Sequence, residues 1–163
     1  MVKILLSLLI CLITTFNFLI EPVAAKLITQ NDPAILVCFS GGQEIARKTV
    51  VAGPFADEYK FAHEVKVVDS MGEHQLNFAG GLCIIDQGAA TIKNKLELSD
   101  RLVCYSGAKP VVNFEVYGAE TTVDEYLEGR TFVAKSTGGN LNSDSLHRYL
   151  IFGGGACLGS EIE

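Results

Sequence analysis

A six-residue motif that occurs twice constrains the fold more than any other feature of the chain. Residues 36–41 read Leu-Val-Cys-Phe-Ser-Gly, and residues 102–107 read Leu-Val-Cys-Tyr-Ser-Gly. Each copy is followed by an Asp-Glu-Tyr segment and then by a glycine-rich segment that ends on a cysteine, at 78–83 and 152–157. An ordered set of landmarks rarely recurs by chance, although single short motifs do. We therefore predict a tandem duplication, with units at 26–86 and 95–159, a linker at 87–94 and a tail at 160–163.

The segments between these landmarks have the patterns of β-strands. Residues 61–68 alternate between Phe61, His63, Val65 and Val67 on one side and more polar residues on the other, which is the pattern of a half-buried strand. Gly53-Pro54 is expected to end the second strand, and 55–63 could form at most a short helical turn. We predict an all-β fold with about five short strands in each unit, packed as a sandwich or barrel-like domain.

The N-terminal residues have the pattern of a cleavable signal peptide. Lys3 precedes an apolar run, and Val23-Ala24-Ala25 fits the small-residue pattern before a cleavage site. We expect residues 1–25 to be removed after Ala25, leaving a secreted or periplasmic protein with no membrane attachment. A retained membrane anchor is the alternative, since the apolar run nearly reaches the ~20 residues that span a bilayer.

Four cysteines remain once the segment containing Cys11 is removed. An even number of cysteines in a short exported chain predicts a disulfide framework. The duplication favours one bridge within each unit, Cys38–Cys83 and Cys104–Cys157, each expected to contribute roughly 3–4.5 kcal/mol. The alternative pairing is Cys38–Cys157 with Cys83–Cys104. No C-x-x-C spacing is present and no histidine stands beside a cysteine, so we expect no metal site and no cofactor.

The charge balance and the polar motifs limit the classes of partner. A formal net charge of −6 argues against binding to nucleic acid. The segment 136–145 is predicted to be an exposed loop. It places oxygen-bearing side chains on Asn140, Asn142 and Asp144, which form only part of a calcium loop because its glycine and distal glutamate are missing.

The remaining polar candidates give weaker signals. Asp57-Glu58-Tyr59 and Asp124-Glu125-Tyr126 recur in the two units, and we interpret them as acidic turns whose tyrosines, Tyr59 and Tyr126, could bind a partner. Ser40 and Ser106 have the position of turn serines. The three histidines, His63, His74 and His147, occupy unmatched positions and show no metal spacing or catalytic set. No catalytic residue is predicted.

The sequence favours an exported, non-enzymatic binding or interaction protein that recognises another protein or a surface ligand. Its recognition residues are expected on the 136–145 loop, since loops on rigid scaffolds often carry recognition. Two alternatives stay open. One is a small secreted hydrolase that uses acidic residues or histidines, and the other is an inhibitor of an exported enzyme. The sequence leaves the oligomeric state undetermined.

Overall fold

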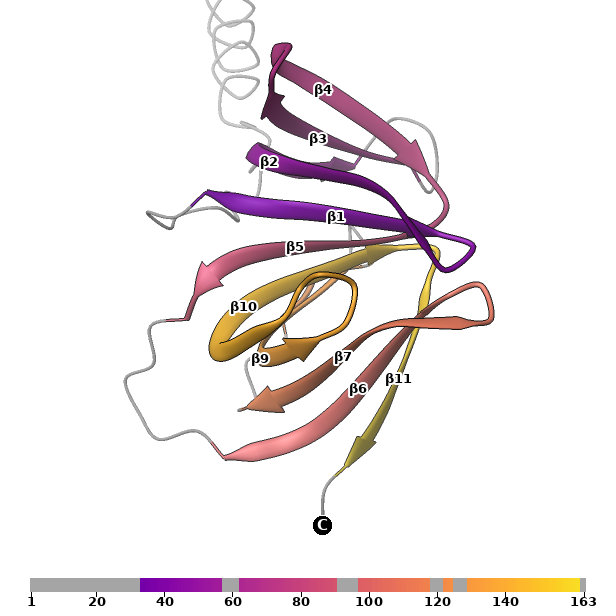
Figure 1. The fold of residues 1–163 in the computed structure, drawn as a ribbon, viewed down its shortest axis with the longest axis vertical. Helices are drawn as coiled ribbons and strands as arrows, with labels where there is room; N and C mark the ends of the chain where they lie inside the picture. Colours follow the sequence, from indigo (N-terminus) through magenta and orange to yellow (C-terminus); the bar gives the residue numbers. More distant parts are fainter. Residues whose placement is uncertain (1–32, 57–61, 91–96, 118–121, 125–128, 162–163) are drawn as a thin grey trace, which may run out of the picture.

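The structure, a computed structural model, describes residues 33–56, 62–90, 97–117, 122–124 and 129–161 (Figure 1). All regular structure in these ranges is β, in eleven strands, which confirms the predicted all-β class. The strands are β1 Ala34–Ser40, β2 Gln43–Ala56, β3 Ala62–Asp69, β4 Gly72–Ala79, β5 Leu82–Ala89, β6 Leu98–Ser106, β7 Lys109–Tyr117, β8 Thr122–Asp124, β9 Gly129–Thr137, β10 Ser143–Gly153 and β11 Ala156–Glu161.

The strands form one continuous curved sheet. Ten of them follow the order β11-β6-β7-β9-β10-β5-β1-β2-β3-β4, and β8 pairs with β9 beside this path. Each neighbouring pair is antiparallel. In Figure 1 the strands lie close together on the side where β5 and β11 begin, and they diverge towards the opposite side.

The two halves of the sheet have the same strand order. The first half runs β5-β1-β2-β3-β4, and the second runs β11-β6-β7-β9-β10. The register of the hairpins β1–β2 and β6–β7 shifts at the same place, just after Cys38 and just after Cys104. These matches are consistent with the tandem duplication that the repeated motif predicts. The second half differs by the additional short strand β8.

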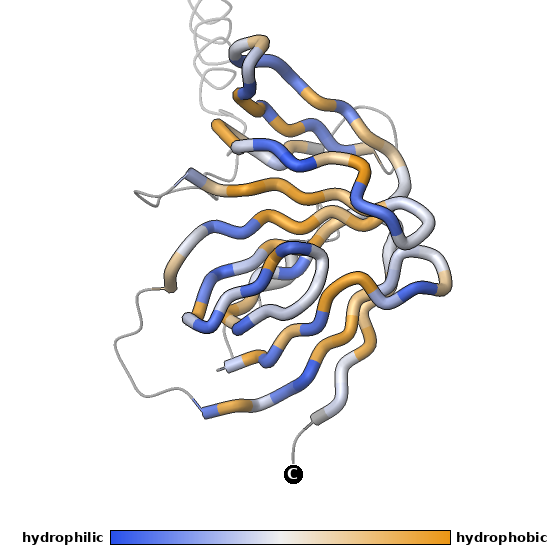
Figure 2. Tube along the Cα trace, viewed as in Figure 1, coloured by the Kyte–Doolittle hydropathy of each residue, from blue (hydrophilic) through white to orange (hydrophobic). Residues whose placement is uncertain are grey.

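Two hydrophobic cores lie on opposite faces of the central strands. On β1, Val37 and Phe39 belong to core 1, whereas Leu36 and Cys38 belong to core 2. Besides β1, core 1 contains buried residues of β5, β6, β7, β9 and β10, and core 2 contains buried residues of β2, β3, β5 and β10. Strands buried on both faces need an almost unbroken apolar sequence. Figure 2 shows such a run along β1, where the hydrophobic colour is nearly continuous.

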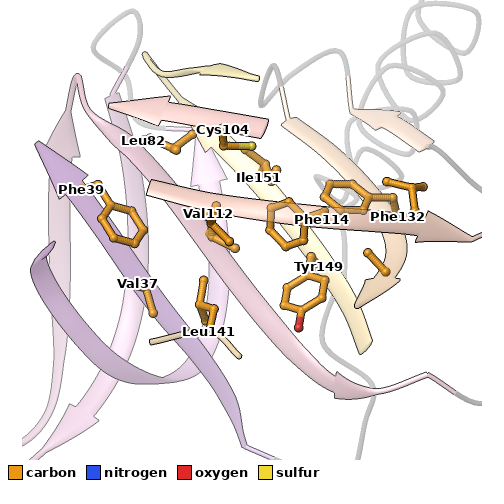
Figure 3. Packing of buried hydrophobic residues seen from close by; sticks show 13 residues of the cluster. Val37, Phe39, Leu82, Cys104, Val112, Phe114, Phe132, Leu141, Tyr149 and Ile151 are labelled. Atoms are coloured by element: carbon orange, nitrogen blue, oxygen red, sulfur yellow. The ribbon is translucent and has the colours of Figure 1, made fainter. Parts of the chain in front are cut away.

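Core 1 is centred on three aromatic rings (Figure 3). The ring centroid of Phe114 lies 5.0 Å from that of Phe132 and 4.9 Å from that of Tyr149. Rings at such separations and tilted to one another add to the stabilisation that burial itself provides. The hydroxyl of Tyr149 points away from Phe114, towards a polar partner described below.

Each half contains its own disulfide, as predicted. Cys38 bonds to Cys83 across β1 and β5, and Cys104 bonds to Cys157 across β6 and β11. The Cα atoms are 4.1 Å and 4.0 Å apart, closer than the ~4.4–6.8 Å expected for disulfides in general. The reason is that both bridges join residues directly opposite each other in antiparallel strands, where close pairs approach to about 4.5 Å.

Two expected element boundaries are wrong. Gly53-Pro54 does not end the second strand, because β2 continues to Ala56 and shifts its register against β3 at Val50, Ala52 and Phe55. Register shifts of this kind accommodate a proline, which has no N–H for the ladder. The 136–145 loop is shorter than expected, since β9 extends to Thr137 and β10 begins at Ser143.

Two other expectations fall partly outside the described residues. The short helical turn expected at 55–63 falls largely on residues 57–61, which lie outside the described ranges, with β2 and β3 on either side. The expected linker 87–94 begins within β5, which extends to Ala89, and its remainder falls mostly on residues 91–96, which also lie outside.

The two units meet at a glycine-lined crossing. Gly154 N donates a hydrogen bond to Gly81 O at 2.6 Å, and a Cβ on Gly153 would lie 2.5 Å from the same carbonyl oxygen. Gly153 also has φ +95°, a conformation that side chains disfavour. The glycines that repeat before each second cysteine therefore allow the backbones of β10 and β5 to come together.

Candidate functional site

A hydroxyl, an imidazole and a carboxylate form a line at the junction of the two units. Ser145 Oγ lies 3.1 Å from His147 Nε2, and His147 Nδ1 lies 2.9 Å and 3.0 Å from the two carboxylate oxygens of Asp86. An ionised carboxylate only accepts hydrogen bonds, so His147 donates from Nδ1 and Nε2 is left to accept from the Ser145 hydroxyl. The order matches that of a serine-hydrolase triad, with both distances in the hydrogen-bonding range that such a set requires.

Strand geometry explains this alignment. Ser145 and His147 are two positions apart on β10 and so share one face of the strand. Asp86 comes from β5, the antiparallel neighbour, where it stands opposite Tyr149. A register shift between His147 and Tyr149 brings the ring within reach of the carboxylate. Asp86 Oδ1 also accepts the backbone N–H of Gly88 at 2.9 Å, which fixes the carboxylate.

Polar contacts continue from Ser145 into core 1. Ser143 Oγ donates to the backbone oxygen of Ser145 at 2.7 Å and lies 3.3 Å from its hydroxyl. Deeper inside, the Tyr149 hydroxyl lies 2.7 Å from Ser136 Oγ. Burial raises the pKa of Tyr149 to about 12, and the nearby negative charge of Asp86 adds to the rise. Tyr149 therefore stays a neutral hydrogen-bonding group at physiological pH.

A surface hollow of about 530 Å³ adjoins this line of polar groups. Its walls are Arg101, Leu102, Val103, Asn113, Phe114, Glu115, Lys135, Thr137, Ser143 and Asp144. We call it the β6–β9 hollow. Its volume lies within the ~300–1,000 Å³ that is usual for ligand sites. Ser143 lines the hollow and also contacts Ser145, so it is the residue that the two features share.

Charges of both signs alternate across the floor of the hollow. Glu115 on β7 stands between Arg101 on β6 and Lys135 on β9 in the strand register. Asp144, at the start of β10, adds a second carboxylate. Lys135 Nζ lies 5.8 Å from the ring centroid of Tyr117, and the Tyr117 hydroxyl donates to Glu115 at 3.4 Å. These contacts position Glu115 and Lys135 within the row of charges that Arg101 completes, beside a partly apolar wall.

The predicted loop residues are found in three different environments. Asp144 lines the hollow. Asn142 Oδ1 accepts the backbone N–H of Gly138 at 2.8 Å, and Asn140 Nδ2 lies 3.5 Å from Glu44 Oε2 on the first unit. Their side chains thus do not gather around one point, and no group of three or more His, Cys, Asp or Glu residues within the described ranges could hold a metal ion.

The 138–142 loop packs on the first unit. Arg47 makes two 2.9 Å bonds to the carboxylate of Glu44 and donates at 3.0 Å to the backbone oxygen of Gly139. The hydrogen bond from Arg47 is the main cause that lowers the pKa of Glu44 below its ordinary value. Leu141 is buried in core 1. This structural role of the loop was not evident from its polar sequence.

Other predicted residues are not brought into the site. Tyr59 and Tyr126 lie outside the described residues. Ser40 and Ser106 end β1 and β6, each just before a hairpin turn, as expected. His63 packs 5.0 Å from the ring of Phe152. His74 Nδ1 lies 3.2 Å from the backbone oxygen of Gly72, a contact local to the β3–β4 turn.

Sequence reasoning did not find a catalytic set because Asp86 is 61 positions from His147. The signal that was available is local. The Ser-x-His spacing on a segment with strand character places the hydroxyl and the ring on one face. The carboxylate becomes identifiable only when the pairing of β5 with β10 is known.

Comparison with known proteins gives a family. The chain is 64% identical over 128 residues to a protein of Synechocystis sp. (strain ATCC 27184 / PCC 6803 / Kazusa) that carries the description "Uncharacterized protein sll1613". The match covers 78% of this chain and 88% of that protein. The chain belongs to the same family as this Synechocystis protein. No family model matches the sequence, and no solved structure matches it.

The two disulfides indicate an oxidising environment for the folded chain. Within the part of the chain that the structure describes, no helix is long and apolar enough to span a bilayer.

Proposed function

We propose that the protein is an exported binding protein that engages a partner at the β6–β9 hollow. The observation that carries this proposal is the row of alternating charges, Arg101, Glu115 and Lys135, on a floor held by three adjacent strands. A rigid, disulfide-bonded sheet positions these groups in advance, which lowers the entropic cost of binding. The signal-like N-terminus and the disulfides support export to the periplasm or the medium.

The charges indicate the class of partner. A polyanion such as nucleic acid would meet Glu115 and Asp144 as well as an overall net charge of −6. A protein surface or a peptide offers groups of both signs, which can pair with the row in register. Opposite charges aligned across an interface contribute to specificity and to the rate of association. We therefore propose a protein or peptide partner.

A capture experiment tests the proposal. The exported protein serves as bait in the exported fraction of its own cells, and bound proteins are identified by mass spectrometry. Arg101→Glu and Lys135→Glu should each abolish capture of the same partner. Lys66→Glu is the matched control, because Lys66 is exposed on β3 outside the hollow. A partner that both hollow variants retain, or that the control also loses, would refute binding at the hollow.

The triad-like line favours a second candidate function, hydrolysis of an ester or amide. Ser145 Oγ would attack the carbonyl carbon while its proton moves to His147 Nε2, and Asp86 would stabilise the imidazolium. The leaving alcohol or amine would take that proton from His147. Water would then attack the acyl group on Ser145 while His147 accepts a proton from the water and returns it to the Ser145 oxygen. The supporting observation is the pair of distances, 3.1 Å and 2.9 Å.

A fluorophosphonate probe, which labels activated serines, separates the two candidates. Labelling at Ser145 that is lost in Ser145→Ala and in His147→Gln would support hydrolysis. Ser70→Ala is the control, since Ser70 is an exposed serine in the β3–β4 turn. Absence of labelling in the folded wild-type protein would eliminate the hydrolase candidate and leave the binding proposal intact.

A further inference from the structure

The joint between the two units pairs two strands, β10 and β5, whose counterparts each have one unpaired edge within the described residues. In the shared strand order, β10 of the second unit has the place that β4 has in the first, and β5 has the place of β11. Inside the chain, β10 pairs with β5 over residues 147–153 and 82–89. Among the described residues, β4 pairs only with β3, and β11 pairs only with β6. In the part of the chain that the structure describes, the sheet therefore has one unpaired edge of each kind.

The directions of the free edges are compatible with the same joint. Each of the nine steps from β11 to β4 along the sheet reverses the strand direction, so β11 and β4 run in opposite directions. A second copy placed beside the first by translation would bring its β11 alongside β4 as an antiparallel neighbour. The internal β10–β5 pair is antiparallel in the same sense. Unpaired N–H and C=O groups at such edges readily form ladders with another strand.

The side chains at the two edges are also compatible. Cys157 packs towards core 1, so its neighbour Leu158 points to the other face of the sheet, where core 2 lies. Leu158 is 63% exposed. Leu76 and Phe78 on β4 are half-buried against core 2. Leu158 of one copy would therefore share a face with Leu76 and Phe78 of the next, where apolar cross-strand neighbours stabilise pairing.

We infer that copies of this chain associate head to tail, with β11 of one copy added antiparallel to β4 of the next. The β11–β4 contact between two copies would repeat the β10–β5 pairing that already joins the two units within one chain. Such an interface uses two different surfaces and is not closed by a two-fold axis, so assembly continues beyond a dimer. The partner is thus a second copy, whereas the hollow binds a different protein.

Sedimentation velocity on the oxidised protein over a wide concentration range tests the inference. Wild-type protein should form dimers, trimers and larger species that increase with concentration. Leu158→Lys places a charge among apolar side chains and should raise the concentration required for assembly by about tenfold or more. Ile45→Lys is the matched control, because Ile45 is 64% exposed but lies on the interior strand β2. Circular dichroism verifies that both variants remain folded.

Three outcomes would overturn the inference. The first is a wild-type protein that stays monomeric at every concentration, since the edges would then be covered by the chain itself or left unused. The second is a dimer that grows no further, which indicates a symmetric contact. The third is an equal effect of the two lysine substitutions, which would show that the β11 edge has no special role.

Discussion

Replacing Gly153 with alanine should weaken the joint between the two units. Gly153 has φ +95°, and a left-handed backbone costs an alanine about 1–2 kcal/mol. The new Cβ would also lie 2.5 Å from Gly81 O, far inside van der Waals contact. Relief requires that this carbonyl move, although it accepts the Gly154 N–H at 2.6 Å. Weakening that bond and the adjacent strand pairing adds about 1–3 kcal/mol.

Gly72→Ala separates the two contributions. Gly72 has nearly the same backbone angle, φ +93°, but nothing lies within 4 Å of its missing Cβ. This variant should lose only the conformational cost, about 1–2 kcal/mol. Gly153→Ala should lose about 2–5 kcal/mol in total. The difference between the variants measures the close approach of β10 and β5.

Urea unfolding of the oxidised proteins, followed by circular dichroism, gives the free energies of unfolding. The expected result is a midpoint for Gly153→Ala that is clearly lower than that for Gly72→Ala. Equal midpoints would show that the backbones do not meet at this crossing. The reasoning about the joint between the units would then be refuted.

Three further predictions concern the disulfide, the buried tyrosine and the loop. Cys104→Ser should lower the free energy of unfolding by about 2–5 kcal/mol and leave Cys157 reactive towards maleimide. The pKa of Tyr149 is raised from 10.0 to about 12 in the folded state, so the stability it contributes is fully present below pH 10 and is lost as the pH rises through 12. Tyr149→Phe should therefore reduce the loss of stability between pH 10 and 12 by about 2–3 kcal/mol, as measured by urea unfolding at each pH. Arg47→Ala should cost about 1 kcal/mol or less because the pair is partly exposed, yet it should speed amide hydrogen exchange around Gly139.

The repeated motif favoured the cysteine pairing that the structure contains, and the strand patterns between its copies predicted the β class. Cys38 and Cys104 lie on equivalent strands, β1 and β6, and the structure joins each to the cysteine of its own half. The alternating pattern of 61–68 likewise corresponds to β3, Ala62–Asp69. These features follow from local periodicity and from repetition, both of which are visible in a single sequence.

Features that depend on contacts between distant segments could not be predicted. Gly53-Pro54 looked like the end of a strand because the register shifts that accommodate it depend on β3. The loop looked exposed because Leu141, its one apolar residue, is buried by core 1 and not by local neighbours. The contact between Asp86 and His147 depends on the pairing of β5 with β10, which the sequence does not reveal.

The β6–β9 hollow could not be predicted from the sequence for the same reason. Arg101, Glu115 and Lys135 lie on three strands and become neighbours through their register, which the sequence does not specify. Asp144 was selected from the sequence for its position beside two asparagines. It lines the hollow, whereas Asn142 bonds within the loop and Asn140 contacts Glu44 on the first unit. Patterns within a strand were thus recovered more completely than patterns across strands.

Non-reducing peptide mapping of the exported protein by mass spectrometry tests the central claim most directly, namely that this is an exported chain of two units, each held by its own disulfide. The account predicts an N-terminus at Lys26, one peptide that joins Cys38 to Cys83, another that joins Cys104 to Cys157, and no free thiol. A peptide that joins Cys83 to Cys104, or a chain recovered with reduced cysteines, would contradict it.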